Sequence, residues 1–131
     1  MALPAPAAAC AINIPPPQRI QNGLETGTIA GVAIVAIDNA HYTAKPIADA
    51  HPWKASAKIV EVRRGAGLPK VIEFERGWGS SACEWNTPPL PAKGSRWVVY
   101  FWQDRSGAYR PWLAMTEAEA RQFDPGFTAG Y

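Results

Sequence analysis

Residues 71–102 read VIEFERGWGSSACEWNTPPLPAKGSRWVVYFW and carry most of the structural information in the sequence. The segment begins with an alternating strand pattern, passes through a loop containing Cys83 and a proline-rich turn, and ends in a strand with no polar face. Apolar residues on both faces of a strand are typical of the middle of a sheet, where both faces are covered. A cysteine just before a rigid turn into such a strand favours a disulfide that holds the edge of a small β-barrel.

Strand patterns recur along the chain and are separated by connections that contain glycine or proline. We predict five strands, over residues 27–37, 53–62, 69–76, 97–102 and 109–115. The segment from Asp38 to Ala40 predicts a turn after the first strand, because Asp and Asn favour turn conformations. Five short strands indicate an all-β fold, a small five-stranded antiparallel barrel of the oligonucleotide/oligosaccharide-binding (OB) type.

The N-terminal residues differ in composition from the rest of the chain. Residues 1–18 are rich in Ala and Pro and end in Pro15-Pro16-Pro17. Because proline lacks a backbone N–H and fixes φ, we predict an extended arm here rather than a helix. The opening MALPAPAAAC resembles the end of a signal peptide, so we expect a secreted or periplasmic protein. Lipid anchoring at Cys10 is not expected, because the Leu of a lipoprotein cleavage site is absent.

The remaining residues, 19–131, are expected to form one domain, because a chain of 131 residues can bury a single core. Thr116 and Glu119 have the spacing of a capping box, which predicts a short C-terminal helix over residues 116–124. No apolar run approaches the roughly 18 residues that a membrane span needs. We therefore predict a barrel domain with an extended N-terminal arm, a short C-terminal helix and no membrane span.

Cys10 and Cys83 are the two cysteines of the chain, and they allow one intramolecular disulfide. In an exported protein an even number of cysteines favours such a bridge. The alternative is two separate buried thiols. Neither cysteine has a second Cys or a His at the spacing of a metal site, so no metal site is expected.

Several of these segments together resemble the netrin-like barrel of the tissue inhibitors of metalloproteinases and their bacterial relatives. The resemblance covers roughly residues 10–123 and rests on Cys10, the strands over residues 31–37, 59–65 and 71–74, Cys83, and the aromatic strand that Gly94 introduces. It implies an exported, disulfide-containing five-stranded barrel. Members that inhibit metalloproteinases place an N-terminal Cys-x-Cys on the catalytic zinc. Here Ala11 and Ile12 follow Cys10, and nine residues precede it, so we do not expect that mechanism.

No set of residues in the sequence has the pattern of a catalytic site. His41 and His51 match no metal-binding or general-base motif. The serines before Cys83 do not form the Gly-x-Ser-x-Gly turn of a hydrolase. We therefore predict a protein that is not an enzyme and has no cofactor.

The loop around Cys83 is the best candidate for a contact surface. Trp78 and Trp85 flank the cysteine and are expected to be exposed, and the turn at Pro88, Pro89 and Leu90 follows. Charged residues make up only 18% of the chain, so part of the surface must be neutral or apolar. We predict a non-enzymatic module that binds a protein partner, of which a protease is one case, through this loop and the N-terminal arm.

Two other functions remain open at this stage. The chain could be an assembly subunit that contacts copies of itself through its arm and its tail, Phe127–Tyr131. It could also bind single-stranded nucleic acid, as other OB barrels do, through aromatic and basic residues, namely Trp53, Trp78, Trp85, Trp112, Arg63, Arg64, Lys70 and Arg110. The net charge of +2 and the expected export disfavour nucleic acid.

Overall fold

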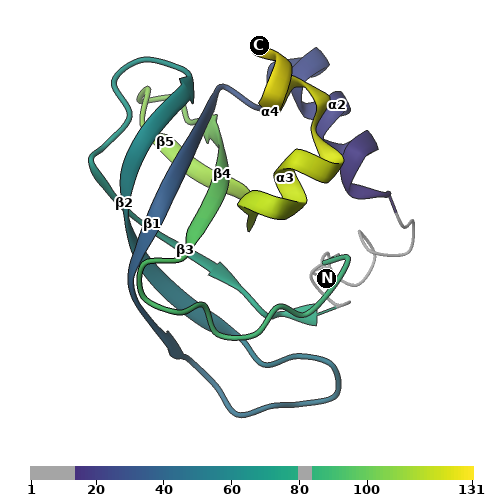
Figure 1. Ribbon diagram of the computed structural model, residues 1–131, viewed down its shortest axis with the longest axis vertical. Coiled ribbons are helices and arrows are strands. Elements are labelled where there is room, and N and C mark those ends of the chain that lie inside the picture. The colour runs from purple at the N-terminus through teal and green to yellow at the C-terminus, as the bar shows by residue number, and fades with distance from the viewer. Residues whose placement is uncertain (1–13, 80–83) are drawn as a thin grey trace.

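The computed structural model describes residues 14–79 and 84–131, which form a strongly twisted antiparallel sheet packed against helices (Figure 1). The five strands are β1 (Gly31–Tyr42), β2 (Trp53–Arg64), β3 (Val71–Arg76), β4 (Arg96–Gln103) and β5 (Tyr109–Thr116). Their order in the sheet is β3-β2-β1-β4-β5. The predicted all-β fold is confirmed, although the sheet does not close into a complete barrel, because β3 and β5 remain unpaired edges.

The concave side of the sheet contains the first of two hydrophobic cores. In β4, which is the predicted strand without a polar face, Trp97, Val99 and Phe101 point into this core. They pack against Trp53 of β2 and Phe74 of β3, and the rings of Trp53 and Trp97 meet edge-on with their centroids 5.4 Å apart. Such tilted aromatic contacts add to the stabilisation from burial.

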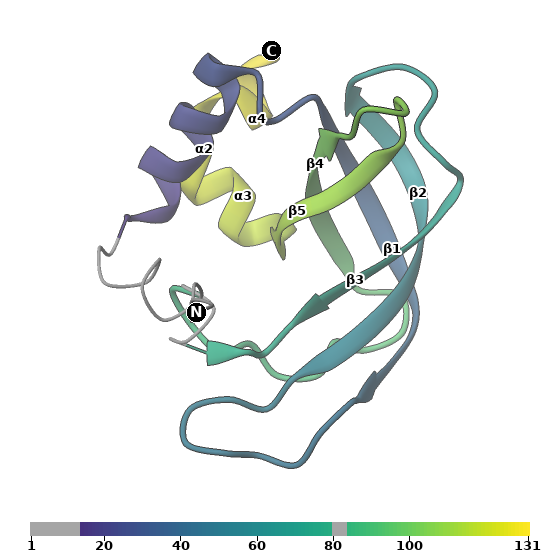
Figure 2. The same cartoon turned by 180° about the vertical axis from the view of Figure 1, so that it is seen from behind.

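The other side of the sheet is covered by three helices, α2 (Pro16–Thr26), α3 (Glu117–Phe123) and α4 (Pro125–Ala129) (Figure 2). Alternate residues of β4, Val98 and Tyr100, face this second core. It also contains side chains from the helices and from β1 and β5, among them Ile20, Val32, Ile34, Leu113, Met115, Ala120 and Phe127. β4 and the first half of β1 therefore have no polar face, because they separate the two cores.

Helix α2 corrects the prediction of an extended arm through residue 18. Pro16 and Pro17 occupy the first turn of the helix, where a missing N–H is not needed and the fixed φ fits. The helix ends at Gly27, whose φ of 80° is left-handed. Because Gly27 ends a helix, the first strand begins at Gly31 and not at the predicted residue 27. Residues 1–13 lie outside the described part of the chain.

The first strand is also longer than predicted at its other end. Asp38 to Ala40 do not form a turn: β1 continues to Tyr42, and Asn39 and Ala40 pair with Ser56 and Ala55 of β2. The turn prediction was wrong because the long hairpin extends beyond the core, where polar side chains on a strand stay solvated. The other four predicted strands are confirmed, with ends that differ by one or two residues.

The C-terminal helix is confirmed, with Thr116 and Glu119 forming the capping box. Asp124 then ends α3 and begins a further helix, α4, which was not predicted. The carboxylate of Asp124 is buried and accepts a hydrogen bond of 2.7 Å from the hydroxyl of Tyr100 and another from that of Tyr131. Burial, together with the neighbouring carboxylate, raises the pKa of both tyrosines. The tail is thus folded back onto its own domain, with Phe127 fully buried.

Candidate functional site

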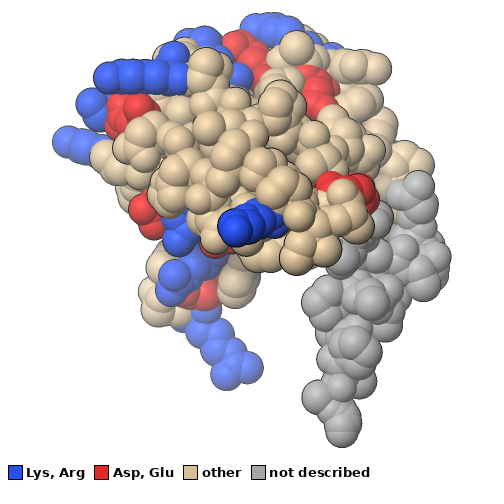
Figure 3. Space-filling model, turned by 90° about the horizontal axis from the view of Figure 1, so that it is seen from below, with Lys and Arg blue, Asp and Glu red and all other residues tan. Residues whose placement is uncertain are grey.

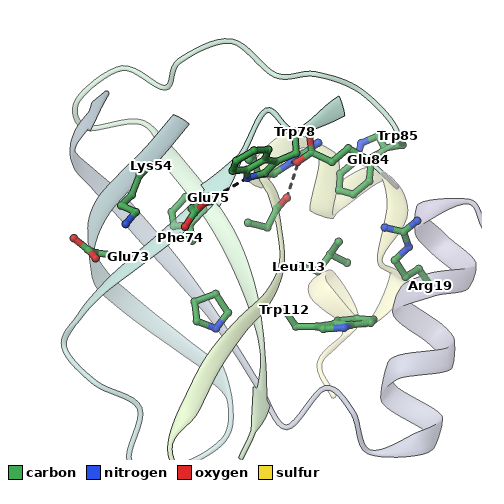
Figure 4. A pocket seen from close by; sticks show the side chains of 13 residues that line it. Arg19, Lys54, Glu73, Phe74, Glu75, Trp78, Glu84, Trp85, Trp112 and Leu113 are labelled. Atoms are coloured by element: carbon green, nitrogen blue, oxygen red, sulfur yellow. Dashed lines mark hydrogen bonds and ion pairs between the residues drawn. The ribbon is translucent and has the colours of Figure 1, made fainter. Parts of the chain in front are cut away.

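A cleft of about 440 Å³ lies along the gap between the two unpaired edge strands, β3 and β5 (Figure 4). This volume falls within the range of about 300–1,000 Å³ that is typical of ligand sites. Its walls combine aromatic and charged side chains from β2, β3, β5, α2 and the loop that follows β3. The lining residues are Arg19, Lys54, Glu73, Phe74, Glu75, Arg76, Trp78, Glu84, Trp85, Pro111, Trp112, Leu113 and Ala114.

Strand β3 presents main-chain hydrogen-bonding groups toward the cleft. The N–H of Ile59 donates to the carbonyl of Lys70 at 2.9 Å, which fixes the phase of the β2–β3 ladder. In an antiparallel pair every second residue bonds to its neighbour strand. The N–H and C=O groups of Val71, Glu73 and Glu75 therefore point away from β2, along the free edge. An edge of this kind can pair with another strand.

Strand β5 offers fewer main-chain hydrogen-bonding groups along its own edge. Pro111 has no N–H, as expected for a proline that is tolerated only at a sheet edge. The register of β5 against β4 shifts at this point, which leaves Trp112 as an extra residue in a bulge. The indole of Trp112 forms one wall of the cleft and also contacts α2, where Gly23 has no side chain to block it. The richer hydrogen-bonding edge of the cleft is consequently β3.

Arg76, the last residue of β3, bridges the two edges at one end of the cleft. Its side chain is only 4% exposed. The guanidinium donates to Glu84 at 2.7 Å, to the carbonyl of Ala114 on β5 at 3.1 Å, and to the side chain of Asn86 at 2.8 Å. It also lies over the ring of Trp85, 4.3 Å from the centroid. One buried cation therefore holds β3, β5 and the following loop together.

Glu84 and Glu119 complete this anchor. Glu84 accepts hydrogen bonds from the backbone N–H groups of Gly77 and Gly79, each at 3.0 Å. Glu119 of α3 accepts from the indole of Trp85 and the amide of Asn86, both at 3.0 Å. Burial tends to raise the pKa of Glu119, but the hydrogen bonds from Trp85, Thr116 and Asn86 outweigh it, and the net result is a lowered pKa. The described residues on either side of the gap at 80–83 are thus held at one end of the cleft.

The structure brings two of the five predicted contact residues to the cleft. Trp78 is 43% exposed, and its indole donates to Glu75 at 3.3 Å. Trp85 lines the cleft but is half-buried, so the two tryptophans are not an exposed pair.

The other three predicted contact residues lie elsewhere. Pro88 is buried, and its carbonyl accepts a 3.0 Å hydrogen bond from the indole of Trp53. Leu90 packs against the first core, and Pro89 is exposed outside the cleft. The turn therefore packs partly against the first core, and its role as a contact surface stays a prediction.

The central role of Arg76 and the free edge of β3 were not predicted from the sequence. A signal for Arg76 was present, because it alternates with Ile72 and Phe74 and must share their inward face. An arginine on the apolar face of a strand indicates a buried partner. The free edge had no such signal, because strand order is not encoded in the pattern of one strand.

Other candidates do not assemble into a site. The ring of His51 stacks on that of Tyr42, with centroids 3.5 Å apart. Within residues 14–79 and 84–131, no three His, Cys, Asp or Glu side chains are placed to hold a metal ion. Cys10 and Cys83 both lie outside the described residues, so the disulfide remains a prediction.

The residues suggested for nucleic-acid binding are also dispersed. Trp53 is fully buried, and Arg110 forms an ion pair with Asp104 at 3.0 Å. Arg63 lies over the ring of Phe127, on the helical side of the sheet. On the face shown in Figure 3, charged side chains are scattered among large uncharged areas and form no continuous basic surface.

In the described part of the chain, no helix has the length and apolar character required to cross a membrane. Comparison with protein-family models, with curated proteins and with solved structures gave no match.

Proposed function

We propose that this protein is a non-enzymatic binding module that takes an extended segment of a partner protein as an additional strand on the edge of β3. The observation that carries the proposal is the free edge of β3 beside a cleft lined by Phe74, Trp78 and Trp112. Main-chain pairing supplies affinity in strand addition, and pockets for alternate side chains supply specificity. Both elements are present along this edge.

The binding free energy is limited by the number of main-chain groups on the free edge, which come from Val71, Glu73 and Glu75. If each hydrogen bond contributes about 0.5–1.5 kcal/mol net, pairing along three residues supplies only a few kcal/mol. Burial of one or two apolar side chains in the cleft adds about 1.5–3 kcal/mol each. After the entropic cost of association, we expect affinities that are roughly micromolar.

The anchor at Arg76 supports this function because it fixes the site in advance. A rigid, preformed edge loses little conformational entropy when a segment binds. The hydrogen bonds of Arg76 and Glu84 hold the end of β3 and the chain that follows it. The binding edge thus stays ordered without a neighbouring strand on its free side.

A displayed library of random nine-residue peptides, selected on the immobilised protein, tests the proposal. Selected peptides would be synthesised in three forms, one unmodified, one with N-methyl groups at the odd backbone positions and one with them at the even positions. We expect N-methylation in one of these two phases to weaken binding at least about tenfold, since only that phase removes donors to β3, while every side chain is kept. We also expect binding to slow amide exchange at Val71, Glu73 and Glu75.

A protein variant provides the matched control. Glu73→Pro removes an N–H that faces the cleft and leaves the β2–β3 ladder bonds in place, because the bonded residues are Ile72 and Phe74. This variant should fold and bind the unmodified peptides more weakly. Failure to select any peptide, equal binding of the three peptide forms, or protection of amides elsewhere would each overturn the proposal.

We also infer that the chain is exported, that Cys10 and Cys83 form a disulfide, and that the fold is of the netrin-like type. The support is the composition of residues 1–18 and the resemblance described above. The intact mass of the native protein tests export, because it gives the mature N-terminus, and it also tests the disulfide. A mass two hydrogens lower than that of the reduced chain would show the bridge. A mass unchanged by reductant would rule it out.

A further inference from the structure

The free edge of β3 carries two exposed carboxylates, Glu73 and Glu75, which alternate with the buried side chains of Ile72, Phe74 and Arg76. A strand added to β3 would place its own outward side chains directly beside these glutamates. Side chains that face one another on adjacent strands have Cβ atoms about 4.5–5.5 Å apart, and opposite charges there are favourable. All partner strands have the same main chain, so the negative charges of Glu73 and Glu75 would favour some of them over others according to the charge of their side chains.

Lys54 and Lys58 of β2 lie on the same face of the sheet as these glutamates but do not form close ion pairs with them. Among the described side chains, none forms an ion pair with Glu73 or Glu75 within 4.0 Å. On β2, the residue opposite Glu73 is Ser56, which is uncharged, while Lys54 is opposite Glu75. Glu73 is consequently the stronger determinant of the two.

The same two glutamates disfavour pairing between copies of this chain. Antiparallel pairing of β3 with β3 would bring the carboxylates of two copies together, and like charges at facing positions are destabilising. Charged residues on edge strands commonly protect against such self-association. The occupant that fits this edge best is therefore a different segment, with the opposite charge.

The inward side of an added strand would meet a different surface. Phe74 and Pro111 line the cleft on that side, and the charged residue of this face of β3, Arg76, is buried and paired with Glu84. Alternate residues of the bound segment would therefore need to be apolar. Basic residues on one face and apolar residues on the other produce a basic–apolar–basic pattern.

We propose that the partner segment is an extended, basic stretch with Lys or Arg at alternate positions facing Glu73 and Glu75 and apolar residues between them. This inference rests on the proposed function, because it names the class of segment that the β3 edge accepts. It predicts a preference that depends on charge and weakens as salt screens the pairs.

Three matched peptides, TKVKVKT, TQVQVQT and TEVEVET, test the charge preference by fluorescence anisotropy at low and high salt. We expect the wild-type protein to bind the Lys peptide at least about tenfold more tightly than the Glu peptide, with the Gln peptide in between. The double variant Glu73→Lys/Glu75→Lys should reverse this order. Both residues are exposed, so the variant should fold, which circular dichroism would verify.

A second double variant, Glu25→Lys/Glu61→Lys, changes the net charge equally but lies outside the cleft, and it should leave the order unchanged. Equal binding of the three peptides, or the same order in the Glu73→Lys/Glu75→Lys variant, would overturn the inference and leave strand addition intact. If no peptide bound to any of the proteins, at concentrations well above micromolar, strand addition itself would be contradicted.

Discussion

Replacing Arg76 with methionine is the sharpest test of how the two sheet edges are held. Methionine fills similar space and keeps the apolar stem, but it donates no hydrogen bond. The change leaves the carboxylate of Glu84 and the carbonyl of Ala114 without the guanidinium that binds them at 2.7 and 3.1 Å. The side chain of Glu84 is only 11% exposed, so water can replace little of what is lost.

Removing one partner of a buried ion pair typically destabilises a protein by about 3–5 kcal/mol. The contact of Arg76 with the ring of Trp85 adds about 0.5–2 kcal/mol to the bonds that are lost, but the losses are not additive. We therefore expect Arg76→Met to lower the free energy of unfolding by about 3–5 kcal/mol. Arg76→Lys should recover only part of this, because an ammonium cannot reach three acceptors as the planar guanidinium does.

Urea unfolding followed by tryptophan fluorescence and by circular dichroism would measure these differences. The double variant Arg76→Met/Glu84→Gln is the essential companion, because it removes the unpaired charge that the single change leaves behind. We expect it to be more stable than the sum of the single changes predicts, by at least about 1 kcal/mol. A loss below about 1 kcal/mol for Arg76→Met, or strict additivity in the cycle, would refute the view that Arg76 anchors the edges.

Three further predictions concern the helices and the β4–β5 turn. Gly23→Ala should destabilise the protein by about 1–3 kcal/mol in urea unfolding, despite the better helix propensity of Ala, because the new methyl group lies 2.7 Å from the side chain of a buried isoleucine; a stabilised variant would contradict this packing. Tyr100→Phe should cost about 1–2 kcal/mol by the same assay, since Asp124 is buried and loses a donor; an unchanged midpoint would contradict it. The pKa of Asp104 should be about 2 by NMR titration, because of the hydrogen bonds led by that from Ser106. Its small stabilising effect should be complete above the unfolded pKa of about 3.9 and disappear as the pH falls through 2, and Ser106→Ala should raise this pKa.

Local patterns predicted most of the sheet, because strand alternation and burial on both faces are properties of short segments. The alternation of Trp53, Ala55 and Ala57 gave the inward face of β2 correctly, and the run from Trp97 to Phe101 identified the central strand. Both features depend on which face of a strand is covered, and the order of apolar and polar residues along that strand indicates the covered face.

Features that depend on distant parts of the chain could not be predicted in this way. Prolines at positions 16 and 17 indicated an extended arm. A helix begins there instead, and it is stabilised by packing its buried face against the sheet. Whether β3 and β5 close the barrel depends on Pro111 and the bulge at Trp112, on a strand far from β3 in the sequence. The tryptophans of the site were identified from the sequence, whereas its free edge required the strand order. The netrin-like resemblance and export stay predictions.

The two hydrophobic cores have a consequence for how stability is distributed over the molecule. β1 and β4 lie between the cores and should have the slowest amide exchange, while β3 and β5 each pair along one side only. The unpaired N–H groups of Val71, Glu73 and Glu75 should therefore exchange fastest within the sheet, although Arg76 holds the end of β3 in place. The exposed residues of β3, Val71, Glu73 and Glu75, belong to neither core, so they can vary, and acquire new partners, at little risk to folding.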